Sequence, residues 1–84
     1  MNPRVAKVVP LENHQLKITF TNGEVRLFDV SPYLNGAVFQ PLRNPGYFKT
    51  VRVAHGTVIW PNEADFCPDT VYELSMPLTE PQTA

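Results

Sequence analysis

The side chains that could do chemistry are two histidines, one cysteine and a short run of carboxylates. His14 and His55 stand far apart, and neither has a second ligand at helix or strand spacing. Each is therefore interpreted as a solvent-exposed turn residue. The sequence contains no paired Cys/His spacing, so we expect no metal site, and no motif indicates another cofactor.

Cys67 lies between Phe66 and Pro68. A reactive thiolate would need a basic setting, whereas acids surround this position, so a small buried side chain is the favoured interpretation.

Three neighbouring carboxylates, Glu63, Asp65 and Asp69, could form an acid pair or a weak cation site. Turn and cap roles explain Asp65 and Asp69 more simply, because both can accept bonds from nearby backbone N–H groups. We predict no catalytic residues and no enzymatic activity. An enzyme that uses Asp65 with His14 or His55 is the weakest alternative.

Length and composition limit the elements that could position these groups. The 84 residues are enough for one small domain with a thin core, and 43% hydrophobic residues favour a folded chain. A single cysteine excludes an internal disulfide and favours a reducing, cytoplasmic setting. No segment approaches the roughly 20 apolar residues of a membrane span, and no signal peptide is expected.

The charge is unevenly distributed along the chain. Residues 1–60 carry all seven basic side chains and three acidic ones, whereas residues 61–84 carry five acids and no base. The two parts are expected to neutralise each other in the fold, although a mildly basic sheet face is a second interpretation.

The clearest local pattern is a hairpin around Asn22-Gly23. A two-residue type I′ loop would pair Phe20 with Val25 and Ile18 with Leu27. One face would then be apolar and the other polar; the predicted apolar face comprises Leu16, Ile18, Phe20, Val25 and Leu27, and the polar face Gln15, Lys17, Thr19, Glu24 and Arg26.

A second hairpin is predicted around His55-Gly56, with Val53 opposite Val58 and an apolar face that includes Val51 and Trp60. Residues 4–9 form a further strand. The fold class is therefore α+β: a small antiparallel sheet of about five strands, with two tight hairpins and short helices packed on one face.

The short helices are marked by proline and cap residues. Ser31 and Asn44 each precede a proline and are predicted N-caps, and Asp69 or Thr70 would cap a helix near residues 68–74. We expect a single domain over residues 1–76 and a flexible tail over residues 77–84.

Trp60 supports two interpretations. It could be a binding anchor at an interface, or a core residue packed against Phe66 and Tyr72; the inward strand pattern favours the core. The Trp60-Pro61 bond could be cis.

Several of these segments together resemble the bacterial "domain of unknown function 2442" family. The resemblance rests on Val30 to Leu34, Val38-Phe39 to Leu42, Phe48 to Val53, Trp60-Pro61-Asn62 with Asp65, Cys67-Pro68-Asp69 and Tyr72, and the hairpin Phe20 to Phe28. It covers about residues 3–75. Family members commonly carry glycine where this chain has Glu63.

The resemblance implies a small α+β domain with no established enzymatic activity. Some relatives are fused to a helix-turn-helix, and others are encoded beside a small companion protein in a pairing that resembles a toxin–antitoxin module. We expect no helix-turn-helix here, and therefore a partner that is a small protein or a second copy of the chain.

The resulting hypothesis is a non-catalytic interaction domain with an antitoxin-like role beside a small companion protein. The alternative is a nucleic-acid-associated regulator that uses basic side chains expected on the hairpins. The candidate partner-binding residues are Lys17, Arg26, Arg52, Trp60, Asn62 and Asp65.

Overall fold

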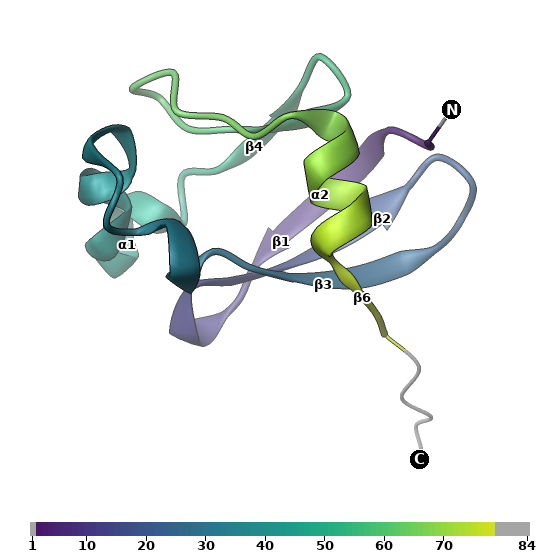
Figure 1. Cartoon of the computed structure of the whole chain (residues 1–84), viewed down its shortest axis with the longest axis horizontal. Helices are drawn as coiled ribbons and strands as arrows, with labels where there is room; N and C mark the ends of the chain where they lie inside the picture. Colours follow the sequence, from purple (N-terminus) through teal and green to yellow (C-terminus); the bar gives the residue numbers. More distant parts are fainter. Residues whose placement is uncertain (1, 79–84) are drawn as a thin grey trace.

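The computed structural model describes residues 2–78 and shows a four-stranded antiparallel sheet beside a two-stranded one (Figure 1). The strand order in the larger sheet is β1-β2-β3-β6. Its strands are β1 (Val5–Pro10), β2 (Gln15–Phe20), β3 (Val25–Asp29) and β6 (Met76–Pro77); the second sheet pairs β4 (Arg52–Ala54) with β5 (Thr57–Ile59). The predicted α+β class is confirmed.

Short helices complete the fold. They are η1 (Glu12–His14), η2 (Ser31–Tyr33), η3 (Ala37–Arg43), α1 (Pro45–Phe48) and α2 (Pro68–Leu74). Figure 1 shows α2 crossing in front of the larger sheet, with α1 at one end of it. The aromatic and aliphatic core lies between these layers.

The β2–β3 hairpin forms, but its register differs by one residue from the prediction. The Phe20 N–H donates to the Glu24 carbonyl at 2.8 Å, and the Gly23 N–H donates to the Phe20 carbonyl at 2.9 Å. These bonds close a three-residue loop over residues 21–23, with Gly23 at φ +89°. An Asn-Gly sequence suits this bulged loop as well as a two-residue loop, because both need a left-handed glycine.

The shifted register moves side chains between the two faces of the sheet. Ile18 now pairs with Arg26 and Thr19 with Val25. Arg26 therefore lies on the face that α2 covers, whereas Val25 and Leu27 lie on the opposite face. The predicted apolar face was wrong for Val25 and Leu27; Leu16, Ile18 and Phe20 are buried as expected, and Phe28 joins them.

The β4–β5 hairpin has the predicted register. Val53 pairs with Val58, and the turn residues His55 and Gly56 have φ values of 54° and 75°. Val58 is buried, but Val53 is 36% exposed, so the predicted apolar face of this hairpin is only partly buried. The Val5 N–H donates to the Gly56 carbonyl at 3.0 Å, which joins the second sheet to β1.

Of the two N-caps predicted from a residue before proline, the structure confirms one and contradicts the other. Asn44 caps α1 as predicted, since its Oδ1 accepts from the N–H groups of Gly46 and Tyr47. Ser31 does not cap η2: its own N–H donates to the Asp29 carboxylate at 3.0 Å, and the cap position belongs to Val30. The preceding strand end therefore supplies the acceptor that we expected from serine.

The start of α2 also corrects two expectations. Cys67 occupies the N-cap position without a side-chain cap bond, so neither Asp69 nor Thr70 is the cap. The Cys67 thiol is exposed rather than buried. The extended approach to the helix alternates, with Ala64 and Phe66 buried, so Cys67 at the helix boundary points outward.

Trp60 is at the centre of the core and has no exposed surface. Its indole N–H donates to the Phe48 carbonyl at 2.9 Å, and its ring meets Phe66 nearly edge-on at 6.1 Å. Tyr72 packs instead on Phe20 at 5.0 Å. The described residues contain no cis peptide bond, so Trp60-Pro61 is trans.

The strand β6 was not foreseen from the sequence. Pro77, the first residue of the predicted tail, pairs with Arg26 of β3, and the Leu78 N–H donates to the Val25 carbonyl at 3.0 Å. Residues 79–84 of that tail lie outside the described residues.

Candidate functional site

The face of the larger sheet that α2 does not cover carries a row of four cross-strand neighbours: Val9, Lys17, Leu27 and Met76. A second row runs beside it through Lys7, Thr19, Val25 and Leu78. We call these eight residues the open face. The first row spans all four strands, and the second crosses β1, β2 and β3 and ends at Leu78, directly after β6, so the strand register places apolar and basic side chains side by side.

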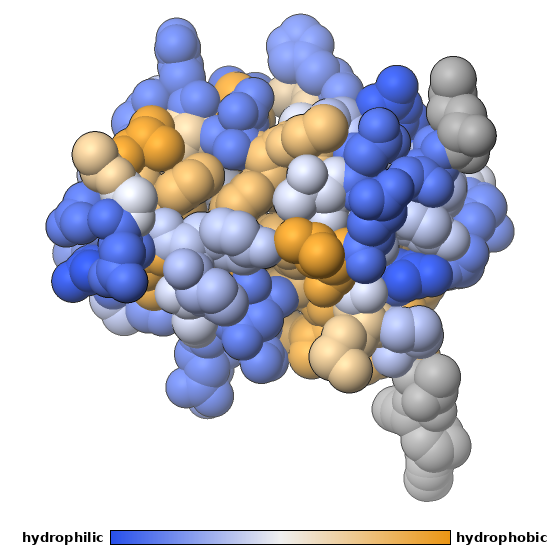
Figure 2. Space-filling model, in the orientation of Figure 1, coloured by the Kyte–Doolittle hydropathy of each residue, from blue (hydrophilic) through white to orange (hydrophobic). Residues whose placement is uncertain are grey.

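Much of the open face is exposed apolar surface. The exposed fraction is 50% for Val9, 68% for Met76 and 40% for Leu78, and Lys7 and Lys17 are also exposed. Figure 2 shows the α2 side of the molecule, opposite to the open face, where further apolar surface lies at the point at which α2 leads into β6, the region of the exposed Leu74. Contiguous exposed apolar surface rimmed by charges is typical of an interaction site.

The edges of the sheet are poorly suited to the addition of another strand. The Leu78 N–H bonds to Val25, so the neighbouring Pro77 nitrogen faces away from β3, where it offers no donor. At the other edge, β1 carries Lys7, Pro10 and a register shift between Val5 and Lys7. Neither edge therefore presents the uninterrupted row of backbone groups that an added strand would need.

The opposite face contains a charged cluster that the sequence analysis did not find. Arg26 Nε donates to Glu24 at 2.8 Å, and its other nitrogens donate to the Ser75 carbonyl and the Tyr72 hydroxyl at 3.2 Å. The guanidinium carbon lies 4.2 Å from the centre of the Tyr72 ring. This cluster holds the C-terminal half of α2 against the sheet.

Glu24 completes the cluster. The Tyr72 hydroxyl donates to Glu24 Oε2 at 2.9 Å. This hydrogen bond, followed by those from Arg26 and Asn22, lowers the pKa of the Glu24 carboxyl below its ordinary value. The ionised carboxylate is therefore the form that suits the fold.

The three basic candidates from the sequence do not form one surface. Lys17 lies on the open face, Arg26 lies on the covered face with its side chain 17% exposed, and Arg52 is exposed at the start of β4. The expectation that Lys17 and Arg26 share a face is wrong, because the bulged loop reverses the orientation of β3 relative to β2.

The other three candidates lie in and around the Trp60-Pro61-Asn62 segment. Trp60 is buried, and the polar groups of Asn62 form hydrogen bonds within the chain. The Asn62 Nδ2 donates to the Val38 carbonyl, its Oδ1 accepts from the Ala64 N–H, and its backbone N–H donates to the Tyr47 hydroxyl. Asp65 is exposed and forms a bridge with Ile59. The segment joins η3, α1 and β5 to one another.

Glu63 follows this segment with φ 70°, and its N–H donates to the Trp60 carbonyl at 2.8 Å. A left-handed backbone is strained for a residue with a side chain. This geometry explains why glycine would be suitable at the position.

The two histidines have different environments. His55 is exposed in its turn, as predicted, but His14 is half-buried. Its Nε2 lies 3.2 Å from the Arg43 carbonyl, and its ring meets Phe48 edge-on at 5.2 Å. The spacing of residues along the sequence could not have predicted these contacts, because Arg43 and Phe48 lie about 30 residues after His14, in other elements.

Together the fold and the open face define a small α+β domain with an exposed surface suited to binding. The family model described as "protein of unknown function (DUF2442)" matches residues 5–77. The chain therefore belongs to this family, as the sequence resemblance implied. No curated protein and no solved structure matches it.

Two further findings concern the part of the chain that the structure describes. None of the helices there is long and apolar enough to cross a membrane. Within the same residues no group of three or more His, Cys, Asp or Glu side chains could hold a metal ion.

Proposed function

We propose that this chain is a non-catalytic interaction module that binds a small companion protein through its open face, in an antitoxin-like role. The observation that carries the proposal is the row Val9, Lys17, Leu27 and Met76, in which the strongly exposed Val9 and Met76 lie at the two ends, with Lys17 and the half-buried Leu27 between them. The pairing of relatives with a small companion protein, implied by the family resemblance, supports the same class of function.

The chemistry of the open face favours one kind of partner. Lys7 lies on the edge strand β1 and Lys17 on the neighbouring β2, whereas Leu27 and Met76 lie on β3 and β6. A second copy of the chain docked face to face would add two further lysines and no acidic side chain from its open face, so like charges on that interface would repel without compensation. A different protein with an apolar surface and acidic side chains would instead be complementary to it.

The alternatives receive less support from the geometry. A nucleic-acid site would need a continuous basic patch, but Lys17 and Arg26 point to opposite faces and Arg26 is held by Glu24. For an enzyme, Asp65 would need a histidine partner; within residues 2–78 no hydrogen bond joins Asp65 to His14 or His55.

The setting that we propose is the bacterial cytoplasm. The only cysteine, Cys67, is exposed and has no partner within the chain for a disulfide. An unpaired exposed thiol is suited to a reducing compartment.

The test is binding of the tagged chain to the purified product of the neighbouring gene, measured by isothermal titration. We expect a 1:1 complex that Met76→Glu weakens by at least about tenfold, because a carboxylate on an apolar contact both loses packing and repels an acidic partner. Val38→Glu is the matched control, since Val38 is 49% exposed but lies on η3, away from the open face.

Two results would contradict the proposal: a neighbouring product that does not bind, or binding that Met76→Glu and Val38→Glu leave equally strong. Circular dichroism of both variants checks that each is folded. The antitoxin-like role needs a separate assay in cells. If the companion is toxic when expressed alone and co-expression of this chain leaves it toxic, that role is wrong.

A further inference from the structure

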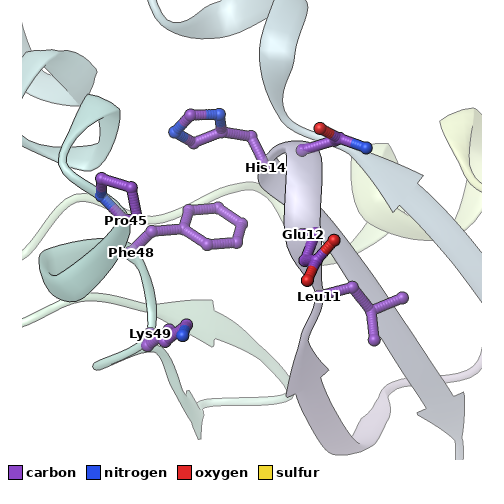
Figure 3. Close-up of a pocket in the computed structure, with 7 residues that line it drawn as sticks. Leu11, Glu12, His14, Pro45, Phe48 and Lys49 are labelled. Atoms are coloured by element: carbon purple, nitrogen blue, oxygen red, sulfur yellow. The ribbon is translucent and has the colours of Figure 1, made fainter.

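A cavity of about 310 Å³ lies at the end of the larger sheet, between η1 and α1. Leu11, Glu12 and His14 line one side, and Pro45, Phe48 and Lys49 line the other (Figure 3). This volume is at the lower end of the range of about 300–1,000 Å³ that small-molecule sites occupy. It is therefore large enough for a small metabolite.

The cavity combines an apolar wall with two opposite charges. Leu11, Pro45 and Phe48 are apolar, and Figure 3 shows the Phe48 ring directed towards the Glu12 side. The Glu12 carboxylate comes from η1, and the Lys49 ammonium comes from the end of α1. In the described part of the chain neither side chain forms an ion pair or a hydrogen bond.

The backbone beside the cavity is left-handed. Asn13 and His14 are consecutive and both have positive φ, 62° and 59°. Asparagine and histidine adopt this conformation more readily than most other residues with side chains. Here it directs His14 onto Phe48 and the Arg43 carbonyl, which fixes one wall of the cavity.

We propose that this cavity binds a free amino acid with an apolar side chain. The ligand's α-ammonium group would pair with Glu12, its carboxylate with Lys49, and its side chain would pack against Leu11 and Pro45. A molecule that carries both charges next to an apolar group matches all three features of the site. A peptide terminus carries only one of the two charges.

The open face and this cavity are separate sites, because the cavity charges lie on η1 and α1 rather than on the strand rows. Failure of companion binding therefore leaves this proposal intact, and the reverse is also true.

Nuclear magnetic resonance titration of the full chain with leucine and with phenylalanine tests the site. We expect the amide signals of His14, Phe48 and Lys49 to shift, with binding weakened at least about tenfold by Glu12→Gln and by Lys49→Met, since each removes a charged contact. Leucinamide and N-acetyl-leucine, which each lack one charge, should bind correspondingly less well.

Glu63→Gln and Lys17→Met are the matched controls, because they remove the same charges outside the cavity. The proposal is overturned if neither amino acid shifts these signals at about 10 mM, a concentration that would detect even millimolar affinity. It is equally overturned if the Glu12 and Lys49 variants bind as the controls do, or if leucinamide and N-acetyl-leucine bind as tightly as leucine.

Discussion

The two faces of the larger sheet differ in what their charged and apolar residues do. On the covered face, Arg26 and Glu24 hydrogen-bond to each other and to Tyr72, and Arg26 also donates to the Ser75 carbonyl at the end of α2. On the open face, the half-buried Leu27 and the exposed Met76 are apolar residues that α2 does not cover. The comparison shows that hydrophobic patterning alone does not identify the buried side of this sheet.

The largest contrast is expected from the adjacent residues Phe28 and Leu27. Phe28 has only 1% exposed surface, so Phe28→Ala should lower the free energy of unfolding by about 3–4 kcal/mol. Leu27→Ala, on the open face, should cost less than about 1 kcal/mol. Urea unfolding measures both values.

Phe28→Ala alone could leave too little folded protein to measure, because a domain of this size is marginally stable. Phe28→Leu, with an expected cost of about 1.5 kcal/mol, is then the second variant. Equal effects at positions 27 and 28 would mean that the two faces are assigned wrongly.

Replacing a charged residue should likewise reduce the stability more on the covered face than on the open face. Arg26→Met removes bonds to Glu24, the Ser75 carbonyl and the Tyr72 hydroxyl, and should lower the stability by about 2 kcal/mol. Lys17→Met should change it by less than about 0.5 kcal/mol. Thermal unfolding distinguishes them, and an Arg26 variant as stable as the Lys17 variant would show that the cluster does not hold α2.

The register that separates the faces depends on the loop at Gly23. Its φ of +89° is unfavourable for alanine, so Gly23→Ala should cost about 1–2 kcal/mol although there is open space around the added methyl group. Gly23→Asn should recover part of this loss, because asparagine tolerates a left-handed backbone. A neutral Gly23→Ala variant would argue for a different loop.

A smaller change, and an increase in stability, is expected at a position outside both faces. Glu63 has φ 70°, so Glu63→Gly should raise the stability by about 0.5 kcal/mol, the relief of strain being partly offset by the entropy of glycine in the unfolded chain. Chemical denaturation gives the value. The exposed Glu12→Gly change, which lacks this relief, is the control and should not stabilise the fold.

The smallest effect concerns the dependence of stability on pH. The pKa of Glu24 is lowered in the folded chain, so ionised Glu24 stabilises the fold at pH values above the ordinary pKa of a glutamate carboxyl. This contribution is lost as the pH falls through the lower, folded pKa. Glu24→Gln should flatten the decline in melting temperature on acidification, whereas Glu12→Gln should retain the slope of the natural chain.

Local sequence patterns predicted much of the fold. The α+β class, the His55-Gly56 turn with its register, the Asn44 cap and the burial of Trp60 all follow from interactions within a few residues or from a strongly apolar pattern. Turn chemistry and proline positions act locally, so they can be read from one segment at a time.

Only the tertiary structure decided which face of β3 is buried. An Asn-Gly loop fits two registers, and the choice depends on the fit of Arg26 against Tyr72, a residue 46 positions away. The same limit applies to His14, which is held by Arg43 and Phe48, and to β6, whose pairing depends on where α2 ends. Contacts between distant segments leave no periodic signal in either segment, so the open face and the cavity became visible only in the folded chain.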